Sequence, residues 1–291
     1  MDKIYKASIE QIKIDGENYV AKQMLPVYAA QKVELDKLHG VVGMMYIKFA
    51  SKGLLVMNAK QQASMNFANK LKVMAKGLGT SEVAKVTDIL SNVYKDTYYK
   101  NAFVQDSGLK VGIKFDMLKQ EYVDAAVNTE YAGEMFDTRI WKNKASMIDT
   151  LQSSLIDAMK GNTTIDKIAS NIKSTFNVTA YESQRLVNTE NARVQSQAND
   201  DIGMSSGVSQ QMYSATLDNK TSEECQADDQ KVWDIDDPDK VTPPENHPNC
   251  RCCLINMPFP GWTPTQRKDN ETGTLIDNTD YNSWKQVKGI D

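Results

Sequence analysis

Prolines are confined to two places in this chain of 291 residues. Pro26 is one of eight, and the other seven lie between Pro238 and Pro264. Residues 27–237 therefore lack the residue that most strongly breaks a helix. Apolar residues recur there at intervals of three and four, as in the segment 83–94. The pattern predicts a mainly α-helical region followed by a C-terminal part of different structure.

Two threonines predict helix starts. Thr163 is followed three residues later by Asp166, and Thr179 is followed three residues later by Glu182. This is the spacing of a capping box, in which the side chains satisfy the free amides of the first turn. We expect one helix to begin directly after each threonine.

A change from helix to strand is expected near residue 205. Gly203 and Gly207 are stop signals, and the segment 209–218, SQQMYSATLD, then alternates like a strand. The fold class expected is mainly α, with a long helical N-terminal region and a small α+β C-terminal module. Four parts follow: a helical N-terminal region at 1–160, connecting helices at 161–204, a Cys/His module at 205–262 and a polar C-terminal tail at 263–291.

The composition is that of a globular chain, with 41% hydrophobic and 25% charged residues. The N-terminal sequence MDKIYKASIE shows no export signal, so we expect folding in the cytosol. The most apolar segment, 41–57, contains Lys48 and Lys52, which interrupt it too often for a bilayer span. We expect a core or interface helix there rather than a membrane-active segment, and no stable membrane span.

Charge is distributed unevenly. Residues 1–200 carry 26 basic and 22 acidic side chains, whereas residues 201–291 carry 8 and 16. No acidic residue occurs from Lys37 to Ser81, a stretch with seven lysines. Such a run indicates a contact surface, either for phosphates or for an acidic protein. The alternative is a solvated helix face. The candidate contact residues are Lys48, Lys52, Lys60, Lys70, Lys72 and Lys76.

All four cysteines and one of the two histidines lie within residues 225–253. In cytosol such clustering favours metal binding over disulfides. Cys225, His247, Cys250 and Cys252 are the ligand types of a closed tetrahedral zinc site, so we expect a structural zinc. Three alternatives remain. The first is reduced thiols with a structural role, and the second is a disulfide formed after the protein is released into oxidising surroundings. The third is catalysis with Cys225 as nucleophile and His247 as base.

The segment NCRCCLI is β-prone, and alternate side chains of a strand share a face. Cys250, Cys252 and Leu254 are then expected on one face, with Arg251 and Cys253 on the other. The metal would contact the first face, and Cys253 would be a small buried hydrophobic residue.

Three motifs occur in order along the second half of the chain. The first is a helix with Arg185, Thr189, Glu190 and Arg193, the second is TLDNKTSEECQADDQKVW with Asp229 and Trp233, and the third is PPENHPNCRC. Together they resemble the phage Mu F-protein-like family of minor head, or head-morphogenesis, proteins, over residues 179–254. This chain has Asp228 where some members have a second cysteine, which makes it a candidate oxygen ligand.

The resemblance implies a minor capsid protein of a tailed bacteriophage. It would be assembled in the host cytoplasm and lie in the virion, at the portal vertex and head interior, with a role in head morphogenesis and in DNA packaging or ejection. Implied partners are the portal protein, a major capsid or scaffolding protein, and packaged double-stranded DNA. The role expected is structural rather than enzymatic, because one clustered histidine does not make the multi-histidine site that catalytic zinc usually has. The other classes are a maturation enzyme or toxin-like transferase, and a dedicated DNA-binding virion protein.

Glu190 and Arg193 lie on a mostly polar stripe of the motif helix. A buried polar stripe must be paired, so we expect both side chains to hydrogen-bond to the loops of the Cys/His module. The alternative is a solvated ion pair of little energetic weight.

Overall fold

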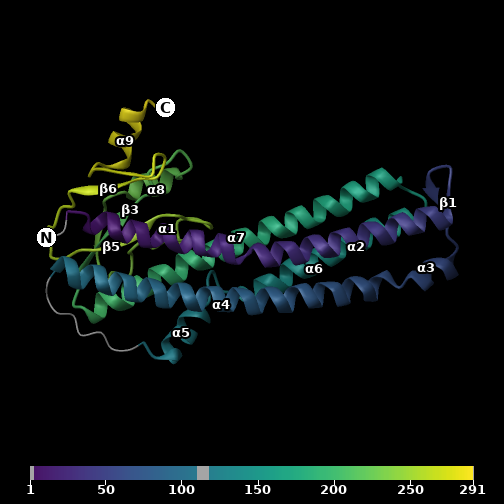
Figure 1. Cartoon of the computed structure of the whole chain (residues 1–291), viewed down its shortest axis with the longest axis horizontal. Coiled ribbons are helices and arrows are strands. Elements are labelled where there is room, and N and C mark those ends of the chain that lie inside the picture. The colour runs from purple at the N-terminus through teal and green to yellow at the C-terminus, as the bar shows by residue number, and fades with distance from the viewer. Residues whose placement is uncertain (1–2, 110–117, 291) are drawn as a thin grey trace. The chain divides into compact units, whose positions relative to one another are not determined.

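The computed structural model describes residues 3–109 and 118–290. Long helices precede a smaller part that contains the longer strands, as predicted for a mainly α chain with a C-terminal α+β module (Figure 1). The chain forms two compact units that alternate along the sequence. Unit 1 comprises Met1–Lys22, Asp88–Thr129 and Val187–Asp291, and unit 2 comprises Gln23–Thr87 and Glu130–Leu186. The predicted boundaries at 160, 204 and 262 stay predictions.

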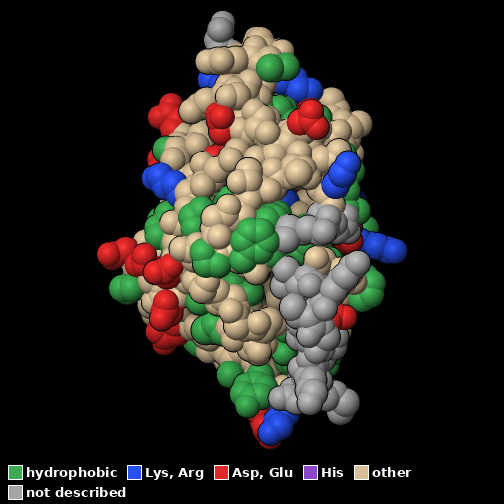
Figure 2. Space-filling view, turned by 90° about the vertical axis from the view of Figure 1, so that its left-hand side faces the viewer, with side chains coloured by type: hydrophobic (Ala, Val, Ile, Leu, Met, Phe, Trp, Pro, Cys, Tyr) green, Lys and Arg blue, Asp and Glu red, His purple; other side chains and the backbone are tan. Residues whose placement is uncertain are grey.

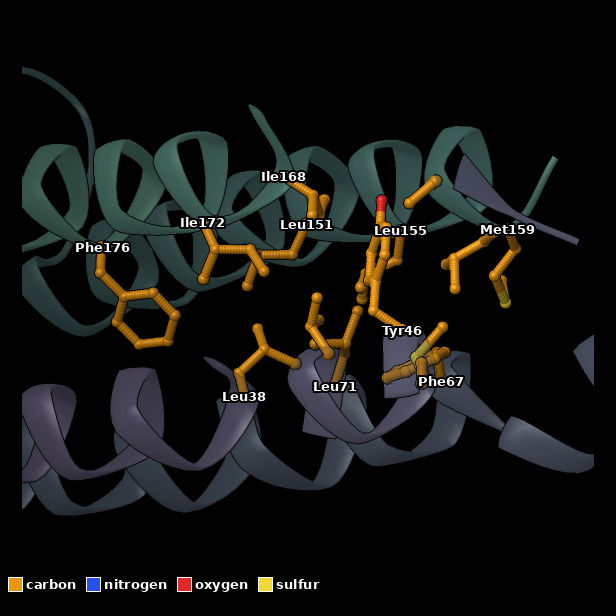
Figure 3. Packing of buried hydrophobic residues seen from close by; sticks show 14 of the residues in the cluster. Leu38, Tyr46, Phe67, Leu71, Leu151, Leu155, Met159, Ile168, Ile172 and Phe176 are labelled. Atoms are coloured by element: carbon orange, nitrogen blue, oxygen red, sulfur yellow. The ribbon is translucent and has the colours of Figure 1, made fainter. Parts of the chain in front are cut away.

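Unit 2 is built on helices. It contains α2 (Leu25–Phe49), α3 (Ala59–Met65), α6 (Phe136–Met159), the first part of α4 (Phe67–Leu109) and the first part of α7 (Ile165–Ser205). Side chains of α2 and α4 face those of α6 and α7, as Leu38, Leu71, Leu151 and Ile172 illustrate in Figure 3. Burial of this apolar stripe from each helix is the main stabilising contribution in the unit.

A polar layer interrupts this apolar core, with one residue from each of the four long helices. The Nζ of Lys144 lies 2.5 Å from Oε2 of Glu82, and both side chains are buried. The amide of Gln31 donates to Glu82 and to the hydroxyl of Ser183. Loss of one partner would leave an uncompensated buried charge, so the layer opposes sliding of one helix along another.

The segment 41–57 is a helix only in its first half, which corrects the prediction of one continuous helix. Helix α2 ends at Phe49, and the strands β1 (Ala50–Ser51) and β2 (Leu54–Leu55) form a short antiparallel hairpin. Lys52 and Gly53 at the turn have φ values of 51° and 76°. A left-handed pair of this kind cannot continue a right-handed helix.

Helix α7 runs without a break from Ile165 to Ser205. The predicted start directly after Thr163 is close, but the predicted start after Thr179 is wrong. Thr179 is buried, and its hydroxyl donates to the carbonyl of Thr175 one turn earlier. The threonine therefore satisfies its hydroxyl inside the helix instead of capping a new one.

Unit 1 contains nearly all of α1 (Tyr5–Gln23), α5 (Gln120–Val127) and the later parts of α4 and α7. All of the strands described for this unit come from the C-terminal third of the chain. A three-stranded antiparallel sheet has the order β4 (Val232–Asp234), β3 (Gln210–Ser214), β5 (Cys253–Asn256). Helix α8 (Glu223–Asp228) lies between β3 and β4 in sequence. The polar tail is folded, as β6 (Gln266–Asp269), β7 (Thr274–Asp277) and α9 (Tyr281–Lys288).

Figure 2 shows one face of the molecule, on which hydrophobic side chains are interspersed with uncharged surface and charged side chains lie mostly toward the margins. Within residues 3–109 and 118–290, no helix combines the length and the apolarity that crossing a bilayer requires.

Candidate metal centre

Cys225, His247 and Cys250 form a group in unit 1 whose ligand atoms all lie within 4.8 Å of one another. Sγ of Cys225 is 3.3 Å from Nε2 of His247 and 3.6 Å from Sγ of Cys250. The first thiol comes from α8, and the other two ligands come from the loop that leads into β5. Two thiols and an imidazole at these separations could hold a metal ion.

The remaining cysteines follow the predicted alternation. Cys252 and Leu254 pack in the cluster that contains Cys225 and Cys250, whereas Cys253 packs against the opposite cluster, which contains Ile255. Cys252 lies outside the three-atom group, although its thiol interacts with both Cys225 and Cys250. Its role as a ligand stays a prediction.

The thiols of this group influence one another's ionisation. Hydrogen bonds from Cys225 and Cys252 lower the pKa of the Cys250 thiol to about 3. The pKa of Cys252 is raised, because its proton is shared with Cys225 and Cys250 and because the side chain is buried. The hydrogen bonds that Cys250 receives therefore favour its thiolate form. A metal ion supplies the positive charge that further thiolates need.

Tyr213 and Asn246 surround the sulfur of Cys225. The Tyr213 hydroxyl lies 3.1 Å from this sulfur, and the Asn246 amide donates to it at 3.6 Å. Asn246 also donates to Asp228 at 2.9 Å, which in turn pairs with Lys231. The carboxylate of Asp228 is thus occupied in orienting Asn246 and is not part of the three-atom group.

Trp233, a motif residue, supports the site through an aromatic contact. Its ring lies edge-on to Tyr213, with centroids 6.3 Å apart and planes at 75°. This is a favourable T-shaped arrangement. Trp233 thereby restrains the ring whose hydroxyl contacts the thiols.

Helix α7 holds the PPENHPNCRC loop in place. The hydroxyl of Thr189 accepts a hydrogen bond from the backbone amide of Asn249 at 2.9 Å, and Asn188 donates to the Asn249 side chain. Ser196 donates to the carbonyl of Pro243 at the other end of the loop. Asn249 has φ of 65°, which places it in the left-handed region, where asparagine is among the best tolerated residues after glycine.

Arg193 does not bind this loop, which corrects the prediction. Its guanidinium donates to Glu190 at 2.7 Å and to the carbonyls of Ala126 and Val127 at 2.7 and 3.2 Å. These carbonyls end α5 and have no partners within their helix. The solvated alternative is also wrong, since Glu190 is fully buried and Arg193 nearly so. Arg185 belongs to unit 2 and forms an exposed ion pair with Glu182.

The motif residue Asp229 accepts hydrogen bonds from three separate segments of the chain. Its carboxylate accepts from the backbone amides of Ala215 and Tyr281, each at 2.8 Å, and from both terminal nitrogens of Arg267. Burial alone lowers the pKa of Arg267, but Asp229 and Glu10 more than offset this and raise it. The arginine therefore stays charged in the interior.

Arg267 and Glu10 were missed by the sequence analysis. Glu10, on α1, accepts hydrogen bonds from Ser214 on β3 and from the backbone of Lys268 on β6, both at 2.6 Å. Arg267 lies in a tail whose composition is polar throughout. Neither residue stands out by type or spacing, because only the fold brings the two ends of the chain together.

The six candidate lysines are all exposed and all belong to unit 2. They lie at the end of α2, in the hairpin turn, and on α3 and α4. None of them forms an ion pair with any residue that the structure describes. Ile47, Val56 and Val73, interleaved with them in sequence, are 79%, 64% and 64% exposed. We call these nine side chains the lysine surface.

The family model described as phage Mu protein F like protein matches residues 149–255, or 107 of the 291 residues. That family is one of phage head-morphogenesis proteins, which are associated with the virion and with capsid-related partners. The resemblance predicted from the motifs is therefore confirmed, and it begins at residue 149 rather than 179. Searches of curated proteins and of solved structures returned no significant match.

Proposed function

We propose that this chain is a structural minor head protein of a tailed phage that acts at the portal vertex and is not an enzyme. The observation that carries the proposal is the lysine surface, which lies in unit 2, whereas the clustered cysteines Cys225, Cys250 and Cys252 are buried in unit 1. One unit thus offers a contact surface, and the other contains a stabilising centre.

The mixture of side chains on the lysine surface favours a protein partner over DNA. Lysines alone would suit a phosphate backbone, which is recognised by charge and hydrogen bonds. Exposed Ile47, Val56 and Val73 gain nothing from phosphates, but they gain from burial in the core of a protein interface. The partner expected is an acidic surface with apolar side chains, which we assign to the portal protein.

The geometry of Cys225, His247 and Cys250 fits a structural zinc site. Zinc–ligand bonds of about 2.3 Å to sulfur and 2.0–2.1 Å to nitrogen give tetrahedral edges of about 3.8 Å between sulfurs and about 3.6 Å from sulfur to nitrogen. The corresponding separations here are 3.6 and 3.3 Å. Cys225, His247 and Cys250 would hold the ion, with Cys252 as the fourth ligand. Such a centre cross-links α8 to the loop before β5.

Burial supports a structural rather than a catalytic use of these thiols. Cys225, Cys250 and Cys252 are 0%, 2% and 3% exposed, so a substrate could not reach them without unfolding of the module. Reactive cysteines are partly exposed. A maturation hydrolase or transferase that uses this group is correspondingly disfavoured.

The experiment is to locate the chain in procapsids by electron cryomicroscopy, alongside co-purification with portal protein. We expect density beside the portal ring, and we expect residues 1–160 to supply more of the contact than the Cys/His module. Density distributed over the whole capsid shell would contradict the proposal. Residues 205–291 can also be deleted. If the shortened chain remains folded but loses all portal association, residues 1–160 do not supply the larger part of the contact.

A further inference from the structure

Unit 1 contains a pocket of about 730 Å³ between α4, α5 and α7. Its lining includes Tyr94 and Tyr98 of α4, Tyr122 of α5, and Asp201 and Met204 of α7. None of the described lining residues belongs to the candidate metal centre or to the lysine surface. Its volume is in the range of small-molecule sites.

Among the described residues that line the pocket, the one charged side chain is the carboxylate of Asp201. The hydroxyl of Tyr94 donates to its Oδ2, and the amide of Gln197 donates to Oδ1 at 2.9 Å. These neutral donors fix its position without cancelling its charge. Among the residues that the structure describes, no cation pairs with it, since the neighbouring Lys240 pairs with Asp200 instead.

The walls of the pocket combine three tyrosine rings and apolar side chains with the neutral polar residues Thr129, Gln197 and Ser205. Tyr94 and Tyr98 are buried, whereas Tyr122 and Met204 are exposed at the opening. The face of an aromatic ring attracts a cation, and the attraction grows where water is partly excluded. A fixed carboxylate among three tyrosines combines charge attraction, cation–π attraction and apolar contact. An anion would be repelled by the carboxylate, and a neutral alkyl group would provide no positive charge to pair with it.

We propose that this pocket binds an alkylammonium group, with the cation at Asp201 and its alkyl chain against the tyrosine rings. The same chemistry is found in a small free amine and in the lysine side chain of a partner protein. The inference goes beyond the proposed structural role, because it does not depend on the portal contact or on zinc.

The test is a titration of the full-length protein, followed by NMR of selectively labelled tyrosines. The probes are n-butylammonium, the neutral isostere 1-butanol, the anion butyrate, and lysine blocked at both its backbone termini. We expect saturable shifts of tyrosine resonances with the ammonium probes, and binding about tenfold weaker or absent with the neutral and anionic probes. Tighter binding of blocked lysine than of butylammonium identifies a protein side chain as the source, and the reverse order identifies a free amine.

Two variants and one control make the test specific to the pocket. Asp201→Asn keeps one acceptor oxygen for Gln197 and places an N–H group that the Tyr94 hydroxyl can accept, but it removes the charge and should weaken ammonium binding about tenfold. Tyr122→Ala alters a side chain that is 60% exposed, so the fold should tolerate it while affinity falls. Tyr181→Ala, at 62% exposure in unit 2, is the matched control and should bind as the wild type does. Equal binding of 1-butanol, absence of saturation with every amine, or unchanged binding by both pocket variants would overturn the proposal.

Discussion

Asp229 and Arg267 form a fully buried, two-point ion pair. Oδ2 of the aspartate lies 2.8 Å from one terminal nitrogen of the guanidinium, and Oδ1 lies 3.2 Å from the other. The pair joins the turn after α8 to strand β6, and Asp229 also accepts a hydrogen bond from the amide of Tyr281, the first residue of α9. A motif residue therefore anchors the polar tail to the module.

Asp229→Asn should destabilise unit 1 strongly. The substitution keeps the shape of the side chain but leaves the guanidinium of Arg267 without its main counter-charge in a buried site. We expect a loss of about 3–5 kcal/mol in the free energy of unfolding, measured by urea denaturation. Glu182→Gln, which removes one charge of the exposed pair with Arg185, should cost less than about 1 kcal/mol. Similar losses for the two variants would refute the anchoring role.

Purified under reducing conditions, the protein should contain about one zinc ion per chain, because clustered thiolates and an imidazole bind this ion tightly. Cys225→Ser should release the metal and expose the module to proteolysis, and Cys252→Ser should weaken metal retention. Cys253→Val is the control, since this side chain points to the opposite face. Elemental analysis of each variant gives the result. Metal-free wild-type protein with freely titrating thiols would exclude the site, and metal loss only in Cys253→Val would reverse the assignment of the two faces.

Thr189→Val should loosen the PPENHPNCRC loop. The valine has the same shape but cannot accept the hydrogen bond from the amide of Asn249, which then lacks this partner. The expected loss is about 1–3 kcal/mol, with faster hydrogen exchange at that amide. Thr150→Val alters an exposed hydroxyl that bonds only within its own helix, and should leave exchange at Asn249 unchanged. Unaltered exchange in Thr189→Val would contradict the contact.

Lys6→Met should change how stability depends on pH. Burial is the largest cause that lowers the pKa of Lys6, from 10.5 to about 8. Between these two values the unfolded chain holds a proton that the folded chain has released, so the folded state gains stability as pH rises. Methionine removes this gain. In urea titrations, the free energy of unfolding of the wild type should therefore rise by about 3 kcal/mol relative to that of Lys6→Met from pH 8 to 10.5. A constant difference across this range would show that Lys6 keeps its ordinary pKa.

Reversing charge on the lysine surface should abolish portal association. We expect the loss in a variant with Lys60, Lys70, Lys72 and Lys76 all changed to glutamate, because repulsion replaces attraction at an acidic partner surface. The matched control changes four exposed lysines of unit 1, namely Lys3, Lys22, Lys119 and Lys220, by the same charge. Retained portal binding together with a flatter salt dependence of DNA binding would assign the surface to DNA instead.

Local patterns determined much of this protein from its sequence. The absence of proline from 27 to 237 and the regular apolar spacing predicted long helices, because helix formation depends on neighbours three and four residues apart. The two-residue period of a strand likewise predicted that Cys252 and Cys253 point to opposite faces. The clustering of cysteine and histidine, two rare residue types, within residues 225–253 identified the candidate metal centre.

Only the tertiary structure decided which polar residues pair. Thr179 matches a helix start in sequence, but the buried environment keeps it within α7. Arg193 meets the end of α5 rather than the loop expected, and Glu10 reaches Arg267 from the opposite end of the chain. Pairing of a buried polar group depends on which chain segments the fold brings within about 3 Å, a distance in space that no local spacing encodes.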